Sequence, residues 1–481
     1  MKNLIVSFAM TLVFASASIA QNFDWAMSGQ GNLVDEGNAV CMDAEGNSYI
    51  TGNFSSNPFL LGKVSLKNSS TNPAAMDAFV AKLGAKGNVV WAIQSNGAGE
   101  ERGIDIACDK TGHIVVVGVF RGDKASFGTF ELTKPTRFPL STFILRINAL
   151  GNIVWAKRAG GKSQTEVKSV STGPDGEIYL TGTFSTATNF GGYEYKSKNG
   201  NNPTAFVAKY LYNGELKWFE QIYGKGRGGQ FASVSGEAIF STEDSRFVYV
   251  TGKFRGNVTF GSGNITSSDF GNDQEGGGWN NIYITKYDSD GRGIWTKNVG
   301  VKQLNFSTIP EVKDIVVDKQ GSSYITGYFP GTLTFGETEM RGNPSKNSWN
   351  HDIFLAKYDA NGNHLWHRNA GGDDADYSHS MALTSNGVLI TGQIVGRNVK
   401  FGNITLADTD INAFTANYDA DGKCLWAIQS KRLVLAKGNG IATNGTNTVI
   451  TGTFLGRILE VVGEKPIKGT GMGNFFVTNI K

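Results

Sequence analysis

The sequence predicts an all-β fold, a seven-bladed β-propeller, and three observations lead to this prediction. A short strand motif, first seen as GNSYITGNF at 46–54, occurs seven times along the chain. A second motif, made of an apolar strand, a tight turn with Gly and a strand with Trp, accompanies the first. The two ends of the chain each hold part of one incomplete copy. Repetition of one supersecondary unit at similar spacing is typical of repeat architectures.

The first motif is a β-strand with a Thr-Gly pair near its end in most copies. Tyr, Ile, Val and Thr are enriched in it, as expected of a strand. The aligned glycines are Gly52, Gly118, Gly182, Gly252, Gly327, Gly392 and Gly452. We expect these glycines at positions of close packing or at β-bulges.

The second motif is a hairpin, seen for example as IFLAKYDANGNHLWHR at 353–368. Its turn, Asp-Ala-Asn-Gly, combines side chains that support a turn with a Gly that takes a positive φ. A further strand with a polar turn precedes each Thr-Gly strand. One unit therefore has four antiparallel strands, which we call A to D in chain order.

The chain ends predict that the ring closes on itself. Residues 23–29, FDWAMSG, resemble a D strand with no A, B or C strand before it. Residues 474–481, NFFVTNIK, resemble a C strand with no D strand after it. The N-terminal strand D is therefore expected to join the C-terminal blade. Such closure removes the open strand edges that otherwise promote aggregation.

These motifs resemble a known repeat family. The pattern D-x-x-G-x-x-Y-x-T-G-x-F, followed by D-x-F-x-A-K-Y-D-x-x-G-x-x-x-W, is similar to the bacterial β-propeller repeats called SBBP repeats, over essentially all of residues 22–481. The fourth unit departs most, since STEDSRFVYV at 241–250 lacks the turn glycine. Asn417 and Asn479 replace the usual strand-C lysine. The resemblance implies an extracytoplasmic propeller, usually of unassigned function.

The first 20 residues resemble a secretory signal peptide. Lys2 gives a positive start, residues 4–15 are apolar, and Ser18-Ile19-Ala20 is a small-x-small cleavage site. We expect residues 1–20 to be removed and residues 21–481 to form a single propeller domain. The protein would then be exported to the periplasm or the extracellular space, with no transmembrane segment in the mature chain.

The three cysteines do not follow a disulfide framework. Cys41 lies 11 residues before Gly52, whereas Cys108 lies 10 residues before Gly118. Strand alternation then places the two side chains on opposite faces, and Cys424 belongs to another type of strand. We therefore expect three buried free thiols.

Charge and histidine spacing exclude several classes of function. The formal net charge is +3, so no basic surface for nucleic acid is indicated. His364 and His367 are three residues apart on a strand, so they are expected on opposite faces, unable to share a metal ion. Paired turn acids such as Asp419 and Asp421 are better explained by turn preference than by calcium. No cofactor and no metal site is predicted.

Seven tryptophans, one in each strand D, are expected to pack between blades. Two other features suggest a binding face, and the first of them is a set of long segments. The long segments between strands B and C are expected to be irregular loops on one face, where binding residues usually lie. Trp279 and Trp349 lie in two such segments and could stack on a sugar or anchor a protein. The alternative is that they only cover these segments.

The second feature is a partial ring of acids at the start of strand A, which lines the central channel. These residues are Glu36, Glu101, Glu166, Glu311 and Asp376. Converging carboxylates can hold a cation or raise one another's pKa. The alternative is that they accept hydrogen bonds from loop amides of a neighbouring blade.

The sequence therefore favours an exported, non-enzymatic binding or scaffold propeller. Its expected partner is an envelope protein, such as part of an outer-membrane assembly, or a glycan. The competing hypothesis is a polysaccharide-degrading propeller that uses the channel-mouth carboxylates as acid and base. Acids spread over several blades favour the first hypothesis, because an active site concentrates its acids in a few blades.

Overall fold

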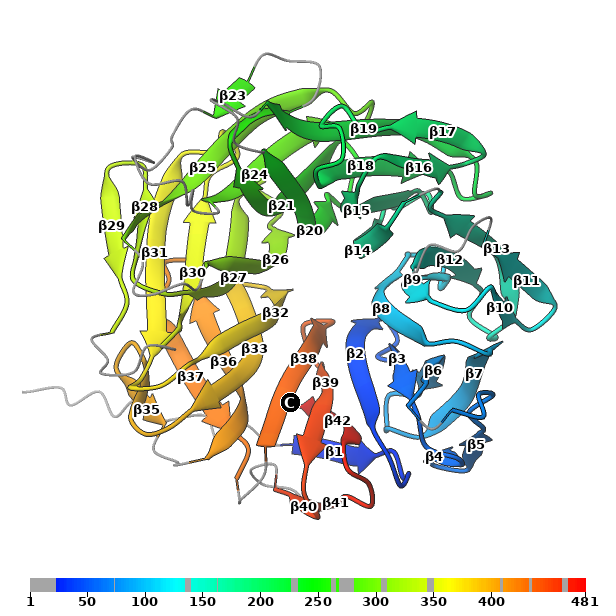
Figure 1. Ribbon diagram of the computed structural model, residues 1–481. Helices are drawn as coiled ribbons and strands as arrows, with labels where there is room; N and C mark the ends of the chain where they lie inside the picture. Colours follow the sequence, from blue (N-terminus) through cyan, green and yellow to red (C-terminus); the bar gives the residue numbers. More distant parts are fainter. Residues whose placement is uncertain are drawn as a thin grey trace, which may run out of the picture.

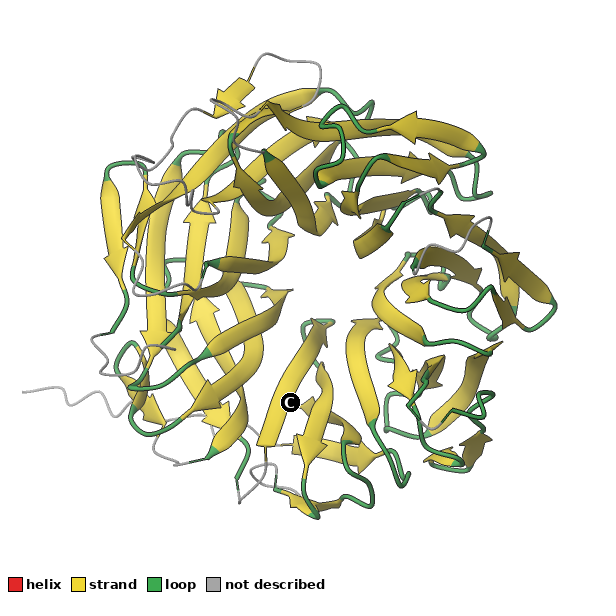
Figure 2. Ribbon diagram, viewed as in Figure 1, coloured by secondary structure: helices red, strands yellow, loops and turns green. Residues whose placement is uncertain are grey.

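The computed structural model describes residues 23–481, except 73, 135–139, 162, 226–231, 261–264, 268–280, 304–308, 344–349, 407–409, 432–434 and 461–465. The described residues form seven antiparallel blades arranged in a ring (Figure 1). Their regular elements are all strands (Figure 2), and no helix among them is long and apolar enough to cross a membrane. The predicted seven-bladed β-propeller is confirmed.

Each blade has four strands, and the strands at each position are named in order from blade 1 to blade 7. The innermost strands, at position A, are β2 (Asp35–Met42), β8 (Glu101–Cys108), β14 (Thr165–Thr172), β20 (Ser233–Ser241), β26 (Glu311–Val317), β32 (Tyr377–Thr384) and β38 (Leu435–Thr443). The second strands, at position B, are β3 (Ser48–Phe54), β9 (Ile114–Phe120), β15 (Ile178–Phe184), β21 (Phe247–Arg255), β27 (Ser323–Phe329), β33 (Gly387–Val395) and β39 (Thr448–Leu455). The third strands, at position C, are β6 (Asp77–Leu83), β12 (Ser141–Ile147), β18 (Thr204–Tyr210), β24 (Asn281–Asp288), β30 (Asp352–Tyr358), β36 (Ile411–Asp419) and β42 (Asn474–Ile480). The outer strands, at position D, are β7 (Val89–Gly97), β13 (Ile153–Ala159), β19 (Leu216–Lys225), β25 (Gly293–Gln303), β31 (His364–Gly371), β37 (Cys424–Gln429) and β1 (Phe23–Ser28).

The ring closes as the sequence predicts, because β1 is the outer strand of blade 7. It pairs antiparallel with β42, where Ala26 faces Thr478 and Met27 faces Val477. The hydroxyl of Thr478 also donates to the carbonyl of Trp25 at 3.1 Å. The first and last described strands therefore share one sheet.

The Thr-Gly motif places a small residue where two strands come unusually close. Gly52 faces Gly37, next to a bulge in β2. A Cβ atom at Gly52 would lie only 1.9 Å from the carbonyl oxygen of Glu36. The hydroxyl of Thr51 donates to the carbonyl of Phe79 at 2.9 Å. The motif therefore holds three strands of a blade together, and the expected close-packing role of its glycine is confirmed.

The repeated tryptophans join each blade to the next one. The indole N–H of Trp91, in blade 1, donates to the carbonyl of Ala149 in the C–D turn of blade 2, at 3.2 Å. Equivalent bonds from one blade to the next are made by Trp25, Trp155, Trp218, Trp295 and Trp366. The predicted packing between blades is confirmed.

The expectation of irregular B–C loops is wrong, because each of these segments contains a β-hairpin. The hairpins are β4–β5 (Phe59–Leu61, Val64–Leu66), β10–β11 (Lys124–Phe127, Phe130–Thr133), β16–β17 (Ala187–Phe190, Tyr193–Lys196), β22–β23 (Asn257–Phe260, Ile265–Ser267), β28–β29 (Thr332–Phe335, Thr338–Arg341), β34–β35 (Val399–Phe401, Ile404–Leu406) and β40–β41 (Ile458–Leu459, Ile467–Lys468). Four of them, β10, β22, β28 and β34, pair with the outer strand of the preceding blade. A Phe-Gly pair recurs at five of the seven turns in the sequence and could have revealed them.

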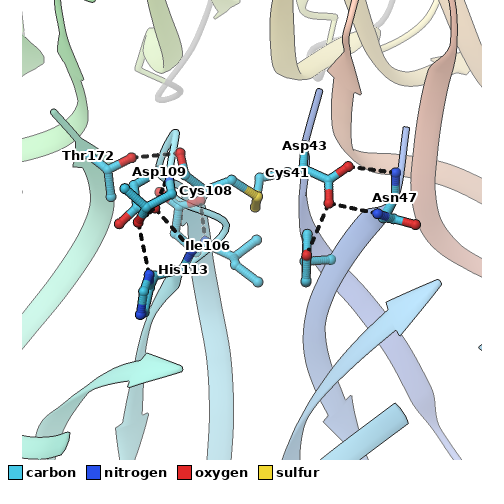
Figure 3. The surroundings of a disulfide bond; sticks show 11 residues. Cys41, Asp43, Asn47, Ile106, Cys108, Asp109, His113 and Thr172 are labelled. Atoms are coloured by element: carbon cyan, nitrogen blue, oxygen red, sulfur yellow. Dashed lines mark hydrogen bonds between the residues drawn. A yellow bond between two sulfur atoms is a disulfide. The ribbon is translucent and has the colours of Figure 1, made fainter. Parts of the chain in front are cut away.

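The expectation of three free thiols is also wrong. Cys41 on β2 and Cys108 on β8 form a disulfide, with their Cα atoms 5.8 Å apart (Figure 3), and Cys424 is the free cysteine of the described part. The two residues do lie on opposite faces of their own blades. However, adjacent blades contact each other through opposite faces of their sheets. Side chains on opposite faces of blade 1 and blade 2 therefore meet, and this brings the two sulfurs together.

The expectation that His364 and His367 of β31 lie on opposite faces is wrong as well. A bulge shifts the register between Lys357 and Tyr358, so that His364 faces Tyr358 while Trp366 faces Lys357. This extra residue reverses the alternation after His364. The rings of His364 and His367 consequently lie together, with Nδ1 of His367 3.3 Å from Nε2 of His364.

Candidate functional site

The central channel has a cavity at each end. One cavity, of about 410 Å³, lies where the innermost strands begin, and we call it the channel mouth. The other, of about 360 Å³, lies where these strands end. Its wall includes one apolar residue from each blade, and we call this set the channel collar: Val40, Ile106, Val170, Ile239, Ile315, Met381 and Ile441.

Each innermost strand brings one polar side chain to the level of the mouth. In each blade, this strand-A residue pairs with the strand-B residue that directly follows the glycine of the Thr-Gly motif. The set is Glu36, Arg102, Glu166, Ser235, Glu311, Tyr377 and Lys437. The mouth is therefore polar all round, and its charges are of both signs.

Alternating charges link blades 3, 4 and 5 across the mouth. Lys168 donates to Glu237 at 2.9 Å, and Lys253 donates to Glu311 at 2.6 Å. Lys253 also lies 3.8 Å from Glu237, while Lys313 lies 3.3 Å from Glu311. This chain of ion pairs holds the side chains in fixed positions, because Lys168, Glu237, Lys253 and Glu311 each have a partner on a neighbouring strand or blade.

Glu237 is the most buried carboxylate of this chain of ion pairs. Burial alone would raise its pKa, but Lys168, Lys253 and a hydrogen bond from Ser235 outweigh burial and lower the pKa below its usual value. Glu237 is therefore ionised at neutral pH. It stabilises the lysines around it and cannot serve as a proton donor there.

The other half of the mouth is more open. Glu36 lies 3.7 Å from Lys437 and accepts a hydrogen bond from Asn53 at 3.3 Å. Arg102 pairs with Glu100, which also accepts from Arg121 at 2.7 Å. Arg102, Arg121 and Lys437 all have more than a third of their side chains exposed. These cations are available to a partner.

Three of the five acids singled out in the sequence lie at the mouth level, namely Glu36, Glu166 and Glu311. Glu101 and Asp376 do not, because each lies one residue earlier and points away from the channel. In blade 6 the A–B turn is shorter, so Tyr377 takes the mouth position. In blade 2 that position belongs to Arg102. The expectation of a convergent acidic ring is therefore wrong for these two residues.

Glu101 and Asp376 are fully buried. Asp376 accepts hydrogen bonds from the amides of Gly372 and Val395, at 2.8 and 2.9 Å, and burial raises its pKa well above the usual value. Burial also raises the pKa of Glu101, to about 8, with a further contribution from the adjacent carboxylate of Asp77. Glu101 is therefore a carboxylic acid at neutral pH, with its carboxyl group close to that of Asp77.

Trp279 and Trp349 lie outside the described residues, so their proposed role stays a prediction. The turn acids that could have suggested calcium are engaged within their own turns. Oδ1 of Asp359, for example, accepts from the amides of Asn361 and Asn363 at 2.9 and 2.8 Å. Within the described ranges, no group of three or more His, Cys, Asp or Glu side chains is placed to hold a metal ion.

No protein-family model matches this chain. An uncharacterised WD repeat-containing protein of Acanthamoeba polyphaga mimivirus is 23% identical over 443 residues, which cover 79% of this chain and 31% of that protein. The regulatory protein FlaEY of Caulobacter vibrioides is 30% identical over 148 residues, which cover 30% of this chain and 15% of that protein. The chain thus spans less than a third of the length of either relative. The first similarity agrees with a repeat propeller.

Among solved structures, an ulvan lyase described as a polysaccharide lyase has a TM-score of 0.42 and 10% identity, covering 88% of this chain and 93% of that chain. The hemagglutinin-neuraminidase of parainfluenza virus 5 has a TM-score of 0.35 and 10% identity, covering 78% of this chain and 88% of that chain. Similarity at this level carries no information about function.

Proposed function

We propose that this protein is an exported, non-enzymatic scaffold propeller that binds a partner protein of the cell envelope through the channel mouth and the rim around it. The ring of seven polar side chains at the mouth carries this proposal. These side chains differ from blade to blade, although the surrounding structural positions repeat. Exposed arginine and lysine beside fixed ion pairs suit a polar partner surface.

The disulfide supports export. Disulfides persist in oxidising compartments, such as the periplasm and the extracellular space, and are rare in the cytosol. The Cys41–Cys108 bond joins two different blades, so it belongs to the assembled ring. The signal-like residues 1–20 and the resemblance to SBBP repeats point to the same location.

The chemistry of the acids favours binding over catalysis. A general acid needs a carboxyl group with a raised pKa within reach of substrate. Glu101 and Asp376 have raised pKa values but are fully buried. At the mouth, Glu237 has a lowered pKa and is held between lysines. The arrangement therefore suits recognition better than proton transfer.

The test compares the mature protein with an Arg102→Ser/Lys437→Ser variant as bait in envelope extracts. The matched control is Lys110→Ser, which removes an exposed cation at the opposite end of the channel. We expect a partner that the wild type and the control retain and the mouth variant loses. Equal retention by all three would contradict the assigned face. Turnover of a polysaccharide that is lost in Glu166→Gln or Glu311→Gln would contradict the absence of catalysis.

A further inference from the structure

The paired histidines of β31 form a feature that the channel does not use. Nδ1 of His367 and Nε2 of His364 face each other at 3.3 Å. Two ligands bound tetrahedrally at 2.0–2.1 Å from a zinc ion are separated by about 3.3–3.4 Å. The two nitrogens thus already have the separation found in a chelate formed by two histidines.

Packing holds both rings in this arrangement. Phe335, from the hairpin β28–β29, stacks on both imidazoles, with centroid distances of 5.2 Å to His364 and 4.7 Å to His367. Tyr358 meets His364 edge-on at 5.5 Å. Both histidines are half-buried, so an ion can approach them from solvent.

The facing nitrogens form a hydrogen bond, and which of them donates depends on the tautomers of the two rings. A neutral imidazole has a single N–H, so its other nitrogen carries a free lone pair. If each ring carries its N–H on the nitrogen that faces away, both facing nitrogens present lone pairs to the same point.

One cation near the pair is held in a different position. The guanidinium of Arg368 donates to the carbonyls of Asp421 and Gly422, at 2.8 Å each.

We propose that Nε2 of His364 and Nδ1 of His367 bind one divalent transition-metal ion of the zinc or copper class. Imidazole nitrogen is a preferred ligand for both ions. Ligating histidines usually carry their N–H on the nitrogen that does not bind the metal. No third protein ligand is placed nearby among the described residues, so water or a ligand of a partner completes the coordination.

The test uses the full mature protein without an affinity tag, freed of metal by a chelator and titrated calorimetrically with Zn²⁺ alone. We expect one ion per chain, and an affinity at least about tenfold weaker in His364→Ala and in His367→Ala. His113→Ala is the matched control, because His113 is also half-buried but contacts only its own turn. With Cu²⁺, the electron paramagnetic resonance spectrum should show coupling to two imidazole nitrogens.

Thermal unfolding of the apo proteins shows whether each variant is folded, and only folded variants are compared. A His364→Ala/His367→Ala protein that binds Zn²⁺ as tightly as the wild type would overturn the proposal. So would a wild type without saturable binding of either ion.

Discussion

The mouth and the collar are built on the same seven strands, yet they differ in how strictly they repeat. Collar positions are apolar in every blade, and each collar residue is at most 8% exposed. Mouth positions carry Glu, Arg, Ser, Tyr or Lys. In β26 the two kinds of position, Glu311 and Ile315, are four residues apart. The strand therefore fixes packing at one end and leaves the residue at the other end free to vary, which is consistent with the proposed binding role.

Carboxylates also have different partners at the two ends. At the collar end, Asp314 of blade 5 accepts a hydrogen bond from the amide of Met381 in blade 6 at 2.7 Å, and Asp105 of blade 2 accepts from Val170 in blade 3 at 2.8 Å. At the mouth, Glu237 and Glu311 accept from lysines. Acids near the collar thus join the backbones of adjacent blades, while acids at the mouth fix other side chains.

The disulfide should give the largest effect, because it fastens two blades at the collar end. Its two cysteines are 67 residues apart in sequence. Chain entropy then predicts a loss of about 4 kcal/mol in the free energy of unfolding for Cys41→Ser/Cys108→Ser. Urea unfolding of the variant measures this loss, with Cys424→Ser as the control. A variant as stable as the control would show that the ring does not depend on this bond.

A pair of substitutions on β26 compares the two ends directly. Ile315 is 1% exposed at the collar, so Ile315→Ala should cost about 3 kcal/mol through lost packing. Lys313, two residues earlier at the mouth, forms a partly exposed ion pair with Glu311, and Lys313→Ala should cost less than about 1 kcal/mol. Equal losses in chemical unfolding would contradict the contrast between collar and mouth.

An effect that builds up gradually, by about 1.4 kcal/mol for each pH unit, is expected from the acid buried behind the mouth. The pKa of Glu101 is about 8 in the folded protein, against 4.5 as its ordinary value. The folded state therefore keeps a proton that the unfolded chain releases, so its stabilising effect is full below about pH 4.5 and is lost as the pH rises through 8.

Unfolding of the wild type and of Glu101→Gln across this range tests the effect. The variant keeps a neutral side chain at every pH, so its stability relative to the wild type should rise towards pH 8. Parallel curves for the two proteins would show that Glu101 ionises in the folded state as it does in the unfolded chain.

The repeats made the fold predictable, because each copy shows the same alternation, turn and tryptophan. Closure followed from counting strands at residues 23–29 and 474–481. The side-chain arrangement was harder to predict. The paired cysteines could be found only by knowing which faces of adjacent blades meet. The histidine pair depends on a bulge in β31, which reverses the alternation just before Trp366. The same bulge precedes the repeated tryptophan in the other D strands, but alternation alone does not predict it.

The sequence predicted where along the channel the candidate site lies, but not which residues form it. Counting back from the glycines found Glu36, Glu166 and Glu311, because their A–B turns have equal length. The same count put Asp376 at the wrong level, since a shorter turn moves Tyr377 there. The mixed charge of the mouth was not predicted, because a pattern of acids alone does not point to the cations at equivalent positions, such as Arg102 and Lys437.

Closure through β1 also determines when the ring can form during synthesis. Blade 7 needs Asn474–Ile480 from one end of the described chain and Phe23–Ser28 from the other. During synthesis, Phe23–Ser28 must wait for Asn474–Ile480 before either strand has its neighbour. The ring consequently stays open until residues 474–480 have been made. For a protein that is exported, as we propose for this one, such a delay limits how early a closed ring can form.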